Sequence, residues 1–428
     1  MSVDVTEEVR ALALRARAAS TALGQASEAK RNEVLQAMAD DLRAYAPGIV
    51  DANAADMEAA REAGTTEALL DRLMLDEARV NDMAAALEDL IKLPDPLGVV
   101  EEERTLYNGL HLKRVSVPLG VVAVVYEARP NVTADAAGIC LKSGNACILR
   151  GGSLAARTNE VVADVLAGSL ERCGLPRDGV CAITTTDRAA TDALMSLHGI
   201  VDVLIPRGGA GLIAHCVEHA KVPVIETGTG NCHVYVHESA NPEWAHDIVL
   251  NAKCRRYGVC NAAETLLIDE QVAPALLPRI FESLMANEVL LHTDSAASRI
   301  AADLGLKEGE QYIVATEEDW ATEYLAPELA VCCVSGVDEA VAHINRFGTK
   351  HSESIVATDA AAIEAFLNGV DAAAVYANAS TAFTDGGQFG LGAEIGISTQ
   401  KLHVRGPFAL EALTSYKYVV EGEGQVRA

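Results

Sequence analysis

Cys260 is the residue of this sequence best placed to act as a nucleophile. It lies in the segment NAKCRRYGVCNAAETLLI, where we expect a loop between a helix that ends near Tyr257 and a strand that begins near Thr265. A cysteine on such a loop can expose its sulfur, whereas a cysteine inside a helix is usually packed. Spacing alone leaves a second interpretation open, in which Cys260 is one more buried core cysteine.

Cys254 is the competing thiol in the same segment. Six residues along a helix correspond to about one and two-thirds turns. Cys254 is therefore expected to face away from whatever Cys260 faces.

The remaining cysteines indicate core packing rather than metal binding. The sequence has 10 cysteines and no CxxC pair, which in a reducing compartment predicts free thiols. Cys232, His233 and His237 could suggest a metal site, but their alternation along an expected strand fits packing better. We expect no metal.

The charge of the chain limits its partners. A net charge of −27 repels nucleic acid and anionic membranes over most of the surface. An anionic substrate must therefore meet a local basic pocket, although each candidate cation could also be a solvated surface charge. The candidates are Arg129, Arg150, Arg207, Lys253, Arg255, Arg256, Lys401 and Arg405.

The elements that must position these residues follow a clear order. Residues 4–92 show helical spacing and predict a helical layer. Residues 104–117 place Asn108-Gly109 between two alternating segments, which predicts a hairpin that docks on another surface. The tail from Ile397 to Val420 has extended character and could pair with that hairpin.

From residue 119 onward, strand and helix patterns alternate and predict a parallel sheet of βαβ units. The expected strands are LGVVAVVY, ACILRG, GVCAIT, VDVLIP and PVIET, with helices near 134–142, 153–172, 187–198 and 210–219. Two strands end in ILRGG and IPRGG; neither is a GxGxxG fingerprint, so either could be an ordinary turn. A second α/β pattern follows from about 230 to 398, with strands near HVYVH, ETLLID, QYIVA, LAVCCVS, SIVATD and AAVYAN.

No apolar run approaches the roughly 20 residues that cross a bilayer, and the N-terminus MSVDVTEEVR is too acidic for a signal peptide. We therefore expect a cytoplasmic protein.

Five longer motifs carry a resemblance that covers about residues 117–420. They are VPLGVVAVVYEARPNVTADAAGICLKSGNACILRGG, PVIETGTGNCHVYV, NAKCRRYGVCNAAETLLI, HSESIVATD and FGLGAEIGISTQKLHVRGP. Together they resemble the glutamyl phosphate reductases (glutamate-5-semialdehyde dehydrogenases), members of the aldehyde dehydrogenase superfamily. Cys254 and Tyr257 depart from this pattern, which usually carries a polar residue and a proline there.

The resemblance implies a reaction and catalytic residues. It implies NADPH-dependent reduction of L-glutamyl 5-phosphate to L-glutamate 5-semialdehyde and phosphate, in proline biosynthesis. Cys260 would form a thioester, and Asn131 would donate to the oxyanion. Glu226 resembles the superfamily glutamate that activates water; because water is unwanted here, either a catalytic or a structural role stays open.

The resemblance also implies the cofactor site. Arg150 replaces a common lysine, and Ser153 stands where a glutamate would favour NAD, so NADPH is expected. Ser153 also fits a helix N-cap. Glu323 resembles the glutamate that binds the nicotinamide ribose. Further cofactor contacts are expected from Arg207, Gly208 and Gly228.

For the substrate's α-carboxylate and α-amino groups, motif position and composition suggest Arg129, Ser398, Lys401, His403 and Arg405. The implied fold is aldehyde-dehydrogenase-like α/β, with a parallel-sheet cofactor lobe, an α/β catalytic lobe and a β-hairpin oligomerisation arm. The expected domains are a cofactor-binding domain (1–101 and 119–228), a catalytic domain (229–397), and the arm with the C-terminal tail (102–118 and 398–428).

The expected partners are the small-molecule substrate, further copies of the chain in a homo-oligomer, and glutamate 5-kinase as a transient partner. Two other functions remain. A hydrolytic NAD(P)-dependent aldehyde dehydrogenase would share Cys260 and Asn131 but would not need phosphate. A nucleotide-binding scaffold without catalysis should lack the nucleophile or the oxyanion donor, and this chain has both.

Overall fold

The computed structural model describes residues 4–127 and 129–427, and the chain forms two compact units. Unit 1 comprises the chain up to Thr227 together with Leu391–Gly396 and the segment from Phe408 onward. Unit 2 comprises Gly228–Gly390 and Ile397–Pro407. The chain passes between the units three times in this region, after Gly390, after Gly396 and after Pro407.

Unit 1 begins with the expected helical layer. Three of its helices start at a side-chain cap, in which Asp4, Ser27 and Asp76 accept a backbone N–H of the first turn. The helices are α1 (Val5–Gln25), α2 (Glu28–Ala44), α3 (Ala46–Glu62), α4 (Glu67–Leu73) and α5 (Glu77–Lys92).

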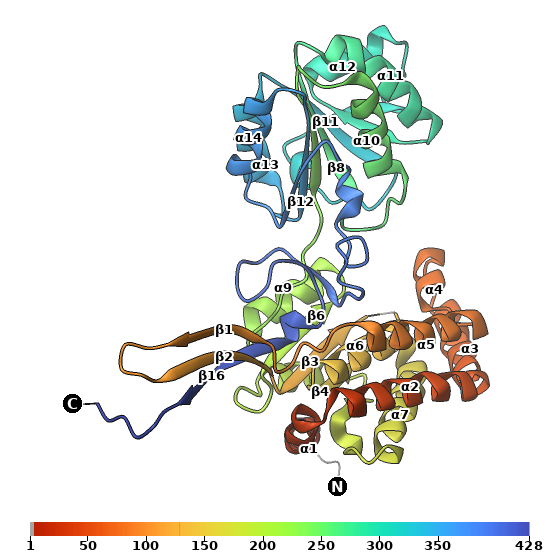
Figure 1. Cartoon of the computed structure of the whole chain (residues 1–428). Coiled ribbons are helices and arrows are strands. Elements are labelled where there is room, and N and C mark those ends of the chain that lie inside the picture. The colour runs from red at the N-terminus through yellow and green to blue at the C-terminus, as the bar shows by residue number, and fades with distance from the viewer. Residues whose placement is uncertain (1–3, 128, 428) are drawn as a thin grey trace. The chain divides into compact units, whose positions relative to one another are not determined.

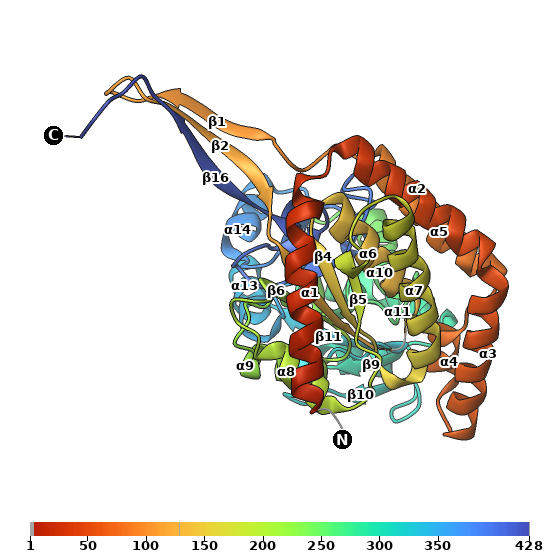
Figure 2. The same cartoon turned by 90° about the horizontal axis from the view of Figure 1, so that it is seen from below.

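The sheet of unit 1 has four parallel strands in the order β5-β4-β3-β6, as the alternating pattern predicts. The strands are β3 (Val121–Tyr126), β4 (Ala146–Arg150), β5 (Val180–Ala182) and β6 (Val203–Arg207). The intervening helices are α6 (Asn131–Lys142), α7 (Ala156–Arg172), α8 (Arg188–Met195) and α9 (Ala210–His219), with short 3-10 turns η1 (Ser153–Ala155) and η2 (Arg177–Gly179). Figure 2 shows α1 lying across this sheet, and α6 and α7 are packed between strands and the N-terminal layer.

Two local expectations in unit 1 were wrong. Helix α6 begins at Asn131 rather than at Ala134, because Pro130 precedes it and its fixed backbone angle suits a helix start. The segment PVIET is no strand, and only an isolated bridge joins Val224 to Leu204. Pro223 has no N–H to extend that ladder.

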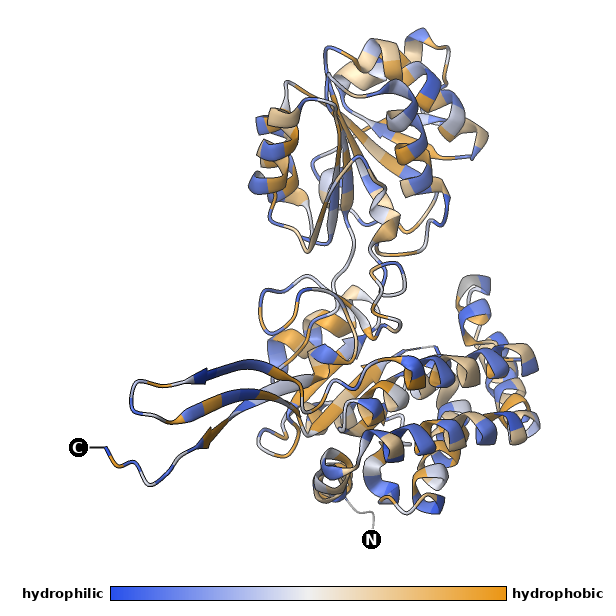
Figure 3. Cartoon of the chain, viewed as in Figure 1, coloured by the Kyte–Doolittle hydropathy of each residue, from blue (hydrophilic) through white to orange (hydrophobic). Residues whose placement is uncertain are grey.

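A three-stranded antiparallel sheet forms the arm, in the order β1-β2-β16 (Figure 1). Its strands are β1 (Val100–Thr105), β2 (His111–Pro118) and β16 (Thr414–Glu421). The predicted hairpin and its pairing with the tail are therefore confirmed. Figure 3 shows that β1 is hydrophilic, and almost all of its residues are exposed.

The hairpin reverses direction at Asn108-Gly109, as the sequence predicted. The loop spans residues 106–110 and is closed by a hydrogen bond of 2.7 Å from the Leu106 N–H to the Leu110 carbonyl. Gly109 has φ +83°, but Asn108 is not in the left-handed region that a type I′ turn would require of both residues.

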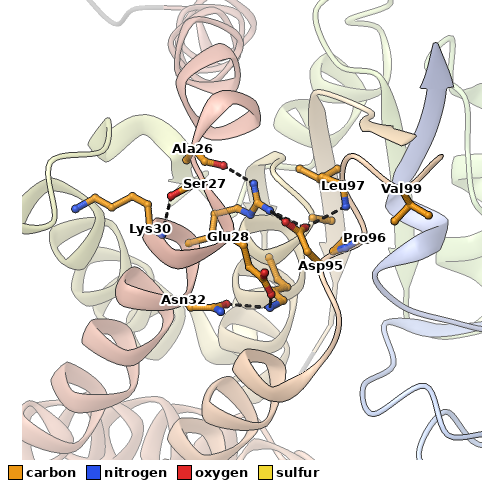
Figure 4. A network of polar contacts seen from close by, with 12 residues as sticks. Ala26, Ser27, Glu28, Lys30, Asn32, Asp95, Pro96, Leu97 and Val99 are labelled. Atoms are coloured by element: carbon orange, nitrogen blue, oxygen red, sulfur yellow. Dashed lines mark hydrogen bonds and ion pairs between the residues drawn. The ribbon is translucent and has the colours of Figure 1, made fainter. Parts of the chain in front are cut away.

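Buried ionic contacts fix the base of the arm to the helical layer (Figure 4). Arg31 of α2 binds both carboxylate oxygens of Asp95 at 2.6 Å, and the same carboxylate accepts the Leu97 N–H. Next to it, Lys142 of α6 donates to Asn32 and lies 3.4 Å from Glu28. The chain therefore enters the arm from a rigid anchor.

Unit 2 contains a seven-stranded parallel sheet in the order β10-β9-β11-β8-β7-β12-β13. The sequence predicted six of its strands and missed β9, which has four residues and follows a helix by a short turn. The strands are β7 (Cys232–Val236), β8 (Ala263–Asp269), β9 (Leu290–Thr293), β10 (Tyr312–Val314), β11 (Glu328–Val334), β12 (Ser352–Val356) and β13 (Ala374–Ala377).

Helices cover both faces of this sheet. Along β7, Val234 and Val236 pack with α10, α11 and α12 on one face, while Tyr235 packs with α13 and α14 on the other. The helices are α10 (Pro242–Cys254), α11 (Ala273–Ala286), α12 (Ser295–Asp303), α13 (Val337–Phe347) and α14 (Ala360–Gly369). Short 3-10 turns are η3 (Asp319–Ala321), η4 (Thr381–Phe383) and, in unit 1, η5 (Glu411–Leu413). The strands β14 (Gly396–Ser398) and β15 (Gly406–Phe408) pair with each other where the chain changes unit.

Within the described part of the chain, no helix combines the length and the apolar character that a membrane span requires.

Candidate functional site

Cys260 lies on the loop between α10 and β8 and is partly exposed. Helix α10 ends at Cys254, three residues earlier than predicted, so the loop is longer than the sequence suggested. The Cys260 backbone is closely packed against Gly230, because a Cβ atom on Gly230 would lie 1.5 Å from the Cys260 carbonyl oxygen. Only glycine fits at position 230.

Hydrogen bonds hold the residues on both sides of this contact. The thiol of Cys232 donates to the Cys260 carbonyl at 3.2 Å. The next residue, Asn261, donates its side-chain amide to the Thr384 carbonyl at 3.0 Å, and its own carbonyl accepts from the Thr381 hydroxyl at 2.8 Å. The nucleophile loop is thus fixed to η4 and to β7.

Cys254 is the last residue of α10. It packs against the hydrophobic core of unit 2, and burial raises the pKa of its thiol. A raised pKa keeps the sulfur protonated and weakly nucleophilic at neutral pH. The structure therefore favours Cys260 over Cys254.

One partly buried carboxylate, Glu323, and one fully buried carboxylate, Glu264, lie close to the nucleophile loop in unit 2. Glu323 accepts the Gly230 N–H at 2.7 Å, and burial raises its pKa. Glu264 binds Lys253 at 2.5 Å, with both side chains fully buried. The sequence singled out Glu323 but assigned no role to Glu264, because nothing in its local pattern distinguishes it from a polar strand residue.

Two of the residues proposed for the substrate, Lys401 and Arg405, pair with Asp371, which the sequence did not identify. Lys401 lies 3.0 Å and Arg405 lies 2.9 Å from the Asp371 carboxylate. These two cations hold the pKa of Asp371 at about 2. Ser398, in the same segment, is buried and accepts the Gln400 N–H.

Two other predicted residues border this segment. Gly228 lies directly against Thr399, whose side chain would collide with a Cβ atom at position 228. His403 makes contacts of its own within the described structure.

Unit 1 contains the other predicted catalytic residues. Asn131 is exposed at the start of α6 and donates its amide to Asp135 at 2.9 Å, one helical turn later. Burial raises the pKa of Asp135 to about 6, although the hydrogen bond from Asn131 and the charge of Arg207 oppose the shift. Glu226 is half-buried in a segment without regular structure, and Arg129 is exposed just before α6.

Arg150 is the last residue of β4, and its guanidinium donates hydrogen bonds to backbone carbonyl groups. It donates to the carbonyls of Gly151, Thr186 and Asp187 at 2.6, 3.2 and 3.3 Å. Its immediate effect is to hold the loop that follows β5. Burial lowers its pKa, but a guanidinium stays charged at neutral pH.

Unit 1 has two hollows near the start of α7, and Ala156 lines both of them. One lies at the carboxyl ends of β3, β4 and β5, where parallel sheets bind ligands. Its polar lining consists of Tyr126, Asn159, Glu160, Thr184, Thr185 and Thr186. The other hollow contains Ser153 and Arg157, with Asp56 and apolar atoms of α3.

At the end of β6, Gly208 and Gly209 meet a carboxylate. Glu127 accepts the Gly209 N–H at 3.0 Å, and a Cβ atom on Gly208 would lie 2.6 Å from the Glu127 carboxyl carbon. The start of α9 therefore binds an anionic group, which fits the positive end of a helix dipole. Arg207 precedes this turn and lies near Gly396.

Among the described residues, no group of three or more His, Cys, Asp or Glu side chains is arranged to hold a metal ion.

Comparison with known proteins shows the family of the chain. The sequence pattern of the aldehyde dehydrogenase family matches residues 2–296. The gamma-glutamyl phosphate reductase of Moorella thermoacetica is 52% identical over 99% of this chain and 100% of its own length, and that of Thermobifida fusca is 50% identical with the same coverage. The crystal structure of gamma-glutamyl phosphate reductase from Thermotoga maritima is 43% identical, covers 98% of this chain and 100% of its own, and has a TM-score of 0.95.

These similarities establish the fold as aldehyde-dehydrogenase-like and the protein as an oxidoreductase that uses a nicotinamide cofactor. The chain belongs to the gamma-glutamyl phosphate reductases, enzymes of proline biosynthesis within the aldehyde dehydrogenase family.

Proposed function

We propose that this protein uses NADPH to reduce L-glutamyl 5-phosphate to L-glutamate 5-semialdehyde, with release of phosphate, through a thioester on Cys260. The observation that carries the proposal is the partly exposed cysteine on a loop fixed by Gly230, Cys232 and Asn261. A positioned thiol is what acyl transfer requires.

The proposed reaction has two halves, acyl transfer to Cys260 and reduction of the resulting thioester. The Cys260 thiolate attacks the acyl carbon of the acyl phosphate, and the carbonyl oxygen becomes an oxyanion. Phosphate leaves with the electrons of the broken C–O bond, and a thioester remains. Reduced nicotinamide, when bound, supplies the hydride for the second half of the reaction. The Cys260 sulfur then departs as thiolate and the aldehyde is released.

Asn131 would stabilise the oxyanion in both halves. Its side-chain amide donates one hydrogen bond to Asp135, which would fix the direction of the remaining N–H before the substrate binds. The Cys260 backbone N–H is the second proposed donor. Glu226 would not activate water, since hydrolysis of the thioester would waste the acyl phosphate.

Unit 1 suits a dinucleotide. The hollow at the ends of β3, β4 and β5 offers three threonine hydroxyls and the Glu160 carboxylate to a ribose, and backbone donors lie at the start of α9. A 2′-phosphate would be recognised beside Ser153, by Arg157 of the same hollow and by Arg150, three residues before the serine. Arg207, Gly208, Gly228 and Glu323 complete the proposed cofactor contacts.

The substrate is a dianion or more at neutral pH and needs cations in unit 2. Lys401 and Arg405 share the single carboxylate of Asp371, which leaves donor capacity on both. We therefore assign them to the α-carboxylate of the substrate, with Ser398, His403 and Arg129 as further contacts.

We also propose a cytoplasmic homo-oligomer, a dimer or a dimer of dimers, in which the arm of one copy pairs with another. Because acyl phosphates are labile, transient contact with glutamate 5-kinase would shorten the exposure of the substrate to water.

The test is run in the oxidative direction, since the aldehyde is the more stable substrate. Purified protein is given glutamate 5-semialdehyde and either NADP⁺ or NAD⁺, at several phosphate concentrations. We expect NADP⁺ reduction that rises with phosphate and saturates. Equal rates with and without phosphate would instead identify a hydrolytic aldehyde dehydrogenase.

A further inference from the structure

The loop that carries Cys260 is closed at both ends by one buried ion pair. Lys253 lies in the last turn of α10, and Glu264 is the second residue of β8. Their side chains are 0% exposed, and Nζ lies 2.5 Å from Oε2. The residues between them, 254–263, contain the whole nucleophile loop.

Burial opposes the charges of this pair. It raises the pKa of Glu264 to about 7 and lowers the pKa of Lys253, while the attraction between the two groups acts in the other direction. An apolar pair of similar size would close the same loop without this cost. The pair therefore calls for an explanation other than stability.

The second oxygen of Glu264 connects the pair to another segment. Oε1 accepts the backbone N–H of Leu325 at 3.2 Å. Leu325 has φ +53°, a conformation that a leucine adopts only when its surroundings impose it. Above the pair, the Tyr324 ring lies 6.0 Å from the Lys253 ammonium, and its hydroxyl donates to Asp319 at 3.0 Å.

This segment returns to the nucleophile through Glu323. Its carboxylate accepts the Gly230 N–H at 2.7 Å, and Gly230 is the residue packed against the Cys260 carbonyl. A continuous set of contacts thus runs from Lys253 to Glu264, to the backbone of Leu325, to Glu323, and through Gly230 to Cys260. All of these residues belong to unit 2.

We propose that Lys253 and Glu264 are positioning residues. They fix the position of the Cys260 thiol relative to the Glu323 carboxylate, which is the proposed ribose contact. Neither residue touches the reacting atoms. The directional bonds of the ion pair fix the loop ends, and the bond to Leu325 fixes where Glu323 stands. The assignment of Glu323 to the cofactor rests on the proposed function; the coupling of the loop to Glu323 does not.

Three variants and one control test the proposal. Glu264→Gln keeps an acceptor for Leu325 but removes the charge, and Lys253→Met removes the other partner. The double variant Lys253→Met with Glu264→Leu replaces the pair by apolar groups of similar volume. The control is Glu243→Gln, on the same helix α10 as Lys253, which breaks the exposed pair between Glu243 and Arg279 of α11.

Each variant is measured in three ways. Thermal unfolding reports stability. The rate of Cys260 alkylation by iodoacetamide, followed by mass spectrometry of the Cys260 peptide with and without NADP⁺, reports the thiol directly. The third measurement is kcat and the KM for NADP⁺ in the phosphate-dependent reaction.

We expect the double variant to unfold near the parent temperature but to lose about 10-fold to 100-fold in kcat, the scale on which small displacements of reacting groups act. Its KM for NADP⁺ should rise. We expect NADP⁺ to alter the rate of Cys260 alkylation in the parent but not in the double variant. The control should match the parent in all three measurements.

A double variant with parental stability, parental kinetics and parental alkylation would overturn the proposal and leave the pair with a structural role. If the single variants fail to fold, the double variant still decides. Because alkylation and its response to NADP⁺ need no substrate, they remain informative even if the parent shows no phosphate-dependent activity, which would count against the proposed function alone.

Discussion

At the scale of single residues, the chemistry depends on which thiol can become a thiolate. Burial raises the pKa of the thiols of Cys181 and Cys216 to about 12 and about 11, and it also raises the pKa of Cys254. Those sulfurs remain protonated near neutral pH and act as small core residues. Cys260 differs because it lies outside the helices and strands, on a loop whose backbone is held by the Cys232 thiol.

Replacing the proposed nucleophile should separate catalysis from binding. Cys260→Ser should abolish turnover while NADPH binding, followed by fluorescence, stays near the parent value, because a hydroxyl is a far weaker nucleophile at neutral pH. Cys254→Ser is the matched control and should remain active. An exchange of the two phenotypes would show that the nucleophile is Cys254.

The oxyanion donor gives a second prediction. Asn131→Ala should lower kcat by roughly 10²-fold to 10³-fold, the usual effect of deleting one such donor, with a smaller change in KM. Asp135→Ala should lower kcat less, since it removes only the acceptor that orients the amide. A parental kcat for Asn131→Ala would identify Asn131 as a structural residue of the turn before α6.

Cofactor choice gives a third prediction. Ser153→Glu should reduce the preference for NADPH over NADH by about 10-fold to 100-fold, since a carboxylate would repel the 2′-phosphate and could accept from a free ribose diol. The ratio of kcat/KM for the two cofactors is measured at fixed ionic strength, because salt screens these charges.

Arg150→Ala and Arg157→Ala test separately how much each cation contributes to recognition of the 2′-phosphate. Arg150 already donates to three backbone carbonyls, so its loss should also loosen the loop after β5 and raise the KM for both cofactors. Arg157 lines the hollow that contains Ser153, so its loss should raise the KM for NADPH alone. If none of the three variants alters the preference, the 2′-phosphate is recognised elsewhere, and Arg207 is the next residue to test.

At the scale of elements, the sequence predicted the helices and strands whose formation depends on neighbouring residues in the chain. The βαβ alternation, the hairpin and α9 follow from periodicity and turn residues. Strand β9 was missed because four residues between helices carry too short a pattern. The ion pair of Lys253 and Glu264, the Asp135 support of Asn131 and the Asp371 cluster could not be predicted, because each depends on which side chains the fold brings together.

The arm offers a prediction at this scale. Leu110→Pro removes the N–H that donates to Asn108, and Leu110 also lies close to Gly422 beyond the end of β16. The sheet has exposed Tyr416, Tyr418 and Val420 on its outer strand, so distorting the hairpin should shift the protein toward monomers. Light scattering that still reports the parent mass, with an unchanged unfolding temperature, would reject the arm as the assembly element.

At the scale of the whole molecule, a chain of net charge −27 must bind an anionic substrate and an anionic cofactor. The net charge does not attract these ligands from a distance, so we expect binding to depend on local donors. The proposed donors are the backbone at the start of α9, Arg150 and Arg157 near Ser153, and Lys401 with Arg405. The same net negative charge repels nucleic acid and other polyanions over most of the surface.

The most direct test of the account is a single-turnover experiment without phosphate. Enzyme, glutamate 5-semialdehyde and excess NADP⁺ are mixed rapidly, NADPH formation is followed, and the protein is then analysed by mass spectrometry. The account predicts a burst of NADPH equal to the enzyme concentration, a glutamyl group on the Cys260 peptide, and steady turnover only when phosphate is added. Continuous turnover without phosphate, or a burst that leaves Cys260 unmodified, would contradict it.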